Sequence, residues 1–154
     1  MSSKQAIDSF LSCRRLAVVG VSRDPKDFSR AVFCAFVERG YDAVPVNPAG
    51  GEAEGRRSVA RVGDVQPPPE AALLLTPPAA TAQVVRECAE AGVRRVWMHR
   101  GGGQGAVSAS ALALCRERGL EVVDGECPFM LLRDAGWFHG VHRFFRRLGG
   151  RLPS

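Results

Sequence analysis

The chain has 154 residues, a net charge of +5 and a hydrophobic content of 45%. This length predicts a single domain that is large enough to bury a core. No apolar run reaches the roughly 20 residues that a membrane helix needs, and residues 1–6 lack the apolar stretch of a secretory signal. The arginines are scattered in pairs without interleaved aromatic residues, a pattern that argues against nucleic acid as the partner. We therefore expect a cytoplasmic protein that binds neither membranes nor nucleic acid.

The first half of the chain alternates between helical and strand patterns. A helix over about 3–12 is followed by an apolar strand over 16–20, and a short polar turn leads into an amphipathic helix over about 28–39. A strand over 42–46 comes next, and after a glycine-rich loop we expect a short polar helix near 58–62.

The second half of the chain continues the alternation after a Pro-Pro-Pro spacer at 67–69. The expected elements are a strand at 71–75, a helix at 79–91, a strand at 93–98, a helix from Ser108, a strand at 120–123 and a tail helix at 137–148.

Three helical patterns end in a glycine that is followed at once by an apolar strand. These glycines are Gly40, Gly92 and Gly119. Glycine closes a helix in the left-handed conformation, and the strand then needs almost no linker. Repeated joints of this kind are typical of βαβ units, so we predict one α/β domain with a five-stranded parallel sheet.

In open α/β sheets, ligands bind beyond the carboxyl ends of the strands. Small polar residues, glycine and proline dominate these ends, which predicts a rigid rim that contacts a ligand through its backbone. The candidate residues are Gly20, Val21, Ser22 and Arg23 after the first strand, Asn47 and Pro48 after the second, Thr76, Pro77 and Pro78 after the third, His99 and Arg100 after the fourth, and Cys127 after the fifth.

The first turn reads Gly-x-Ser and lacks the three glycines of the dinucleotide fingerprint. Dinucleotide sites also place an acidic residue at the carboxyl end of the second strand, where this chain has Asn47. The turn therefore predicts a nucleotide site that does not hold NAD.

Several of these motifs together resemble the CoA-binding domain family, the stand-alone relatives of the CoA-binding domain of the succinyl-CoA synthetase alpha subunit. The resemblance covers residues 14–132. We expect residues 1–13 to form a separate N-terminal helix and residues 133–154 to form a C-terminal helix and its tail. The motifs that carry it are Gly20-x-Ser22, Pro45-Val46-Asn47-Pro48, Pro77-Pro78, Val96-Trp97-Met98 and Cys127-Pro128.

The resemblance implies a Rossmann-like, doubly wound fold with coenzyme A at the first turn. It implies that the CoA phosphates lie near Gly20, Ser22 and Arg23, with Lys26 and Ser29 as further candidates. It places Asn47 and Pro48 on the next part of the rim. The residues implied to flank the adenine end are Thr76, Pro77 and Pro78.

We interpret the chain as a protein that binds coenzyme A or an acyl-CoA without self-contained catalysis. One alternative is a small oxidoreductase or ligase that uses His99 or Cys127, and Cys127 is also a candidate for a mixed disulfide with CoA. A second alternative is a regulatory module that forms a homodimer through the tail helix. In a further alternative, His139 and His142 share a helix face and form a metal site together with Cys127. We nevertheless expect no metal.

Overall fold

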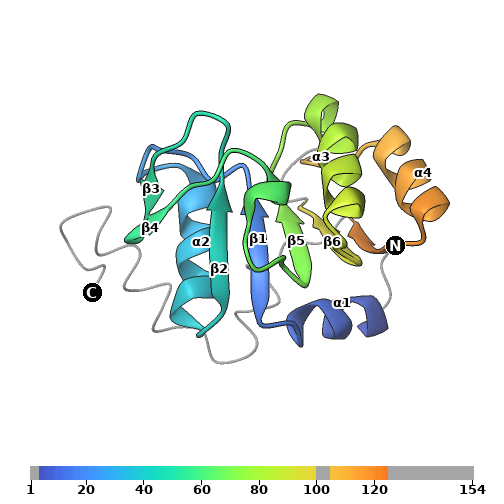
Figure 1. The fold of residues 1–154 in the computed structure, drawn as a ribbon, viewed down its shortest axis with the longest axis horizontal. Helices are drawn as coiled ribbons and strands as arrows, with labels where there is room; N and C mark the ends of the chain where they lie inside the picture. Colours follow the sequence, from blue (N-terminus) through green and yellow to red (C-terminus); the bar gives the residue numbers. More distant parts are fainter. Residues whose placement is uncertain (1–3, 100–104, 125–154) are drawn as a thin grey trace.

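Five parallel strands form the central sheet of the protein (Figure 1). The structure is a computed structural model that describes residues 4–99 and 105–124. The sheet order is β2-β1-β5-β6-β7. The strand order therefore reverses between β1 and β5: β2 is added on one side of β1, and the later strands are added on the other side. The strands are β1 (Arg15–Val19), β2 (Asp42–Val46), β5 (Ala71–Leu74), β6 (Arg95–Met98) and β7 (Glu121–Asp124).

Helices cover both faces of this sheet because each buried strand presents apolar side chains alternately to one face and the other. Leu16 and Val18 pack with helices α1 (Lys4–Leu11) and α2 (Phe28–Glu38), where the rings of Phe10 and Trp97 meet edge to face at 5.1 Å. The opposite face packs against α3 (Pro78–Glu90) and α4 (Ala109–Arg118). The predicted doubly wound α/β fold with five parallel strands is confirmed.

The short polar helix predicted near 58–62 is wrong. The hairpin of β3 (Glu52–Ala53) and β4 (Arg56–Arg57) comes just before this segment, which itself holds a single bridge residue, Val59, and the start of a 3₁₀ turn, η1 (Val62–Asp64). The reason is that β2 lies at the edge of the sheet, and Val59 satisfies its outer backbone groups. The N–H of Val59 donates to the carbonyl of Pro45 at 3.0 Å, and the carbonyl of Val59 accepts from the N–H of Asn47 at 2.8 Å.

The remaining boundaries differ little from the prediction. The strand expected from residue 93 begins at Arg95, because the N–H of Val93 still closes the end of α3 by donating to Cys88. The glycines of the three helix–strand joints all have positive φ angles, as the sequence indicates. None of the described helices combines the length and apolar character of a membrane span. The predicted tail helix at 137–148 lies outside the described residues.

Gly20 stands where the chain leaves β1, and its φ of +96° lies in the left-handed region. A Cβ atom there would lie 2.8 Å from the carbonyl oxygen of Leu75. Gly40 has nearly the same φ, +90°, but a Cβ atom there would meet nothing within 4 Å. A comparison of Gly20 with Gly40 therefore separates the energetic cost of the left-handed conformation from the cost of the close approach to Leu75.

We predict that Gly20→Ala destabilises the protein more than Gly40→Ala does. Gly40→Ala should cost about 1–2 kcal/mol for the left-handed conformation, and Gly20→Ala should cost about 1–3 kcal/mol more because backbone must move. Urea unfolding of both variants measures the difference. Equal losses of stability would show that the approach to Leu75 is not constraining.

Candidate functional site

The candidate site begins at the turn between β1 and α2. In a doubly wound sheet the ligand crevice lies where the strand order reverses, and here that point is between β1 and β5. The turn therefore stands on one side of the crevice, and the segment from Thr76 to Pro78, which follows β5, stands on the other. Gly20 ties the turn to β2 because its N–H donates to the carbonyl of Val46 at 2.9 Å.

A chain of short hydrogen bonds holds the turn in place. The N–H of Ser22 donates to the hydroxyl of the buried Ser29 at 2.8 Å, and the N–H of Asp24 donates to the Ser22 hydroxyl at 3.0 Å. Asp27 caps α2, since one of its carboxylate oxygens accepts from both the N–H of Ser29 at 2.9 Å and its hydroxyl. Within the described residues, the N–H groups of Val21 and Arg23 make no hydrogen bond. These two are therefore the unpaired backbone donors of the turn in the described part of the chain.

Asn47 joins the second strand end to the first turn. Its side-chain amide donates to the carbonyl of Val21 at 2.9 Å, and its side-chain oxygen accepts from the N–H of Ala49 at 2.8 Å. Both ends of the amide are thus fixed. The result is an uncharged rim beside the turn, followed by the exposed Pro48.

Arg23 reaches from the turn to the loop after β2. A Cβ atom at Gly51 would lie 2.7 Å from the Cγ of Arg23, so a side chain at position 51 would force Arg23 to shift. Lys26 is also exposed in the turn, and its N–H donates to the Asp24 carboxylate at 2.9 Å. The segments that follow the first two strands are therefore in direct contact.

The residues after β5 serve mainly to begin α3. The Thr76 and Thr81 hydroxyls lie 2.8 Å apart and both residues are buried. Thr81 also donates to the carbonyl of Pro77 at 3.2 Å, and Pro78 is the first residue of the helix. The Thr76 side chain is thus turned into the protein, while Pro77 is exposed on the rim.

His99, at the end of β6, lies against the start of α2. Its ring centroid is 5.3 Å from that of Phe28, a residue that is 49% exposed. The Nε2 atom of His99 is buried without a hydrogen-bond partner in the described part of the chain. Burial lowers the pKa of the imidazole, so the neutral form is favoured. Arg100 and Cys127 lie outside the described residues.

Sequence reasoning missed Arg30, Glu54 and Phe28. Arg30 is only 8% exposed although it is charged. One signal was present in the sequence: three and four positions after Arg30, α2 has Phe33 and Cys34, which carry no negative charge. The acidic residue three positions before it, Asp27, caps the helix and accepts from Ser29. Its partner therefore has to come from elsewhere in the fold.

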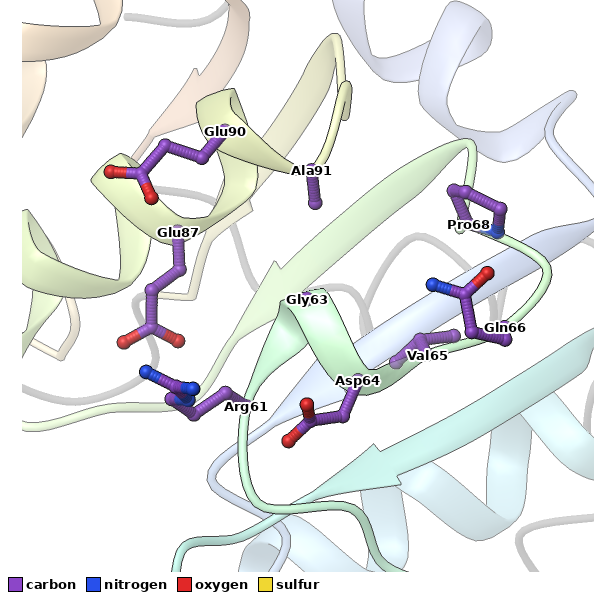
Figure 2. Close-up of a pocket in the computed structure, with 9 residues that line it drawn as sticks. All are labelled: Arg61, Gly63, Asp64, Val65, Gln66, Pro68, Glu87, Glu90 and Ala91. Carbon is purple, nitrogen blue, oxygen red and sulfur yellow. The ribbon is translucent and has the colours of Figure 1, made fainter.

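A hollow of about 440 Å³ lies away from this turn, at the amino end of β5, where α3 ends (Figure 2). Three carboxylates and one guanidinium line it, which makes it a poor site for a polyanion. The lining residues are Arg61, Gly63, Asp64, Val65, Gln66, Pro68, Glu87, Glu90 and Ala91.

Residues 4–99 and 105–124 contain no trio of His, Cys, Asp or Glu side chains placed to hold a metal ion. The histidines and the cysteine of the alternative metal site, at 127, 139 and 142, lie outside these ranges.

The parallel sheet, its strand order and the helices on both faces define a doubly wound α/β protein. The family model described as "CoA binding domain" matches residues 14–133. The chain therefore belongs to the CoA-binding domain family, and this membership supports coenzyme A as its ligand.

Individual relatives agree with this assignment. The chain is 29% identical to the uncharacterised protein YneT of Bacillus subtilis over 81% of its own length and 90% of that protein. It is 32% identical to the alpha subunit of the ADP-forming acetate–CoA ligase II of Pyrococcus furiosus over 58% of its own length, but it spans only 20% of that subunit. A hypothetical protein from Pyrococcus horikoshii has the same fold, with a TM-score of 0.77 and 25% identity over 88% of this chain and 92% of that one.

We predict that His99 makes the protein less stable in mild acid. The folded state resists protonation of the buried imidazole, whereas the unfolded chain takes up the proton near the ordinary value of 6.5. Stability should therefore fall as the pH drops below 6.5. His99→Gln should make this fall shallower, as measured by urea unfolding between pH 7 and about pH 5. Parallel curves for the two proteins would contradict the buried neutral imidazole.

Proposed function

We propose that the protein binds coenzyme A or an acyl-CoA at the turn formed by residues 20–23 and at the neighbouring Asn47, without carrying out a reaction by itself. The observation that carries this proposal is the pair of N–H groups on Val21 and Arg23, which lack partners among the described residues at the point where the sheet order reverses. Family membership supports the same ligand.

The residues of the turn fit a phosphate-bearing ligand. Backbone N–H groups at the start of a helix attract anions, and the positive end of the α2 dipole adds to that attraction. Arg23 is exposed beside these donors, and the buried guanidinium of Arg30 has an Nε atom without a partner in the described part of the chain. Coenzyme A would supply a pyrophosphate and a 3′-phosphate to such donors.

Two carboxylates in the turn act against an anion, and both already serve the backbone. Asp24 accepts from the N–H of Lys26, and Asp27 caps α2. These bonds direct the carboxylate oxygens toward the protein's own donors. The remaining repulsion is offset by the neighbouring cationic side chains Arg23 and Lys26.

Asn47 favours coenzyme A over a dinucleotide. An acidic residue at this strand end would accept hydrogen bonds from a ribose diol and would repel a ribose that carries a phosphate. The fixed, uncharged amide of Asn47 does not repel a phosphorylated ribose, and it offers a ribose diol no carboxylate. By its resemblance to the family, the segment Thr76–Pro78 on the far side of the crevice is the candidate for the adenine end.

We predict that coenzyme A raises the melting temperature of the protein and that NADH at the same concentration does not. A ligand that binds only the folded state stabilises it by mass action, and the binding should weaken as salt is added. Thermal unfolding with each ligand makes the comparison. Equal or greater stabilisation by NADH would refute the proposal and support the oxidoreductase alternative.

Substitution of Ser22 tests where the ligand lies. Ser22→Asp places a negative charge among the donors of the turn and should cost about 1–3 kcal/mol of CoA binding, measured by calorimetry. Ser12→Asp is the matched control, since Ser12 is exposed at the end of α1 and the same charge there should leave CoA affinity unchanged. Unchanged affinity in Ser22→Asp would remove the turn from the site.

A further inference from the structure

Arg30 is a buried cation whose guanidinium makes only long polar contacts with the described residues. One guanidinium nitrogen lies 3.4 Å from the carbonyl oxygen of Ser22 and 3.3 Å from that of Arg23, and the other lies 3.6 Å from the Glu54 carboxylate. Charge-assisted hydrogen bonds are normally about 2.7–2.9 Å long. Burial of a charge is costly unless it is paired and fully hydrogen-bonded. Within residues 4–99 and 105–124, the charge of Arg30 is therefore only partly compensated.

The direction of two peptide groups in the turn depends on this guanidinium. A trans peptide is planar, so its C=O and N–H point in opposite directions. Because the carbonyls of Ser22 and Arg23 face Arg30, the N–H groups of Arg23 and Asp24 point away from it. The N–H of Asp24 donates to the Ser22 hydroxyl, whereas that of Arg23 makes no hydrogen bond within the described residues.

Glu54 supplies the counter-charge from the β3–β4 hairpin. It is the only non-glycine residue with a positive φ in the described part of the chain, at +51°, and side chains other than that of glycine pay for this conformation. Its carboxylate and the Arg30 guanidinium are both largely buried. A strained residue at the hairpin tip thus holds its charge beside the cation that faces the turn.

We propose that Arg30 is a positioning residue for an anionic ligand group, a phosphate of coenzyme A, and that Glu54 competes with this anion for the charge of Arg30. Arg30 turns the N–H of Arg23 outward and attracts the anion across the peptide. This inference rests on the proposed CoA site. It predicts opposite effects for the two partners: loss of Arg30 weakens anion binding, and neutralisation of Glu54 strengthens it.

Calorimetry with coenzyme A on four variants tests the proposal. We expect CoA affinity to fall by about tenfold in Arg30→Gln and to recover in part in Arg30→Lys, which restores the charge without the fork of donors. Glu54→Gln should bind CoA several-fold more tightly while its melting temperature falls. A merely structural role for the pair would make Glu54→Gln bind more weakly, along with Arg30→Gln.

Arg56→Gln is the matched control. Arg56 lies on the same hairpin and donates to the carbonyls of Ala43 at 2.7 Å and Tyr41 at 3.4 Å, so its loss changes the net charge equally and removes bonds to the sheet. We expect lower stability and unchanged CoA affinity. Pantetheine, which has no phosphate, should bind all variants and the wild type alike.

Three results distinguish the possible failures. Equal CoA affinity in the wild type and Arg30→Gln, or weaker binding in Glu54→Gln, overturns the inference and leaves the proposed function standing. A wild type that binds neither CoA nor inorganic pyrophosphate overturns both. If the wild type binds pyrophosphate alone, the proposed function fails, and the same variants titrated with pyrophosphate decide the role of Arg30.

Discussion

The close approach of Gly20 to Leu75 is the constraint on which the site depends. Strands β1 and β5 are neighbours, and the chain leaves them toward opposite faces of the sheet, to α2 and to α3. The turn after β1 has to pass within contact of the carbonyl that follows β5. Only a residue without a Cβ atom allows this path, and the path carries the next backbone N–H groups over the edge of the sheet.

Two independent supports then hold the turn. The side-chain amide of Asn47, which follows β2, donates to the carbonyl of Val21. The guanidinium of Arg30, on α2, faces the carbonyls of Ser22 and Arg23. Carbonyls are thus drawn toward the protein and amide hydrogens are left toward the crevice. The turn has the polarity that a phosphate requires, although it contains one glycine where a dinucleotide site has three.

Much of this arrangement could be predicted from the sequence because it depends on local signals. The helix–Gly–strand joints indicated the parallel sheet, which is confirmed with a core layer on each of its faces. The first turn and Asn47 were predicted together, since strand ends of a parallel sheet share one edge. The structure brings them into direct contact through the hydrogen bond from Asn47 to Val21.

The elements that were missed depend on contacts between distant parts of the chain. The helix expected near 58–62 does not form, because Val59 pairs with the outer edge of β2, a contact that no local pattern reveals. Arg30 pairs with Glu54, which is 24 positions away in the sequence, and Phe28 meets His99 from the far half of the chain. Residues of this kind become visible only when the sheet order places their elements side by side.

The most direct test of the account is a map of backbone amide shifts in the ¹H–¹⁵N spectrum as coenzyme A is added. Binding of coenzyme A at the first turn should give the largest changes at Val21 and Arg23, with smaller changes at the neighbouring Asn47. Largest changes at Gln66, Glu87 and Glu90, which line the hollow at the amino end of β5, would contradict binding at this turn.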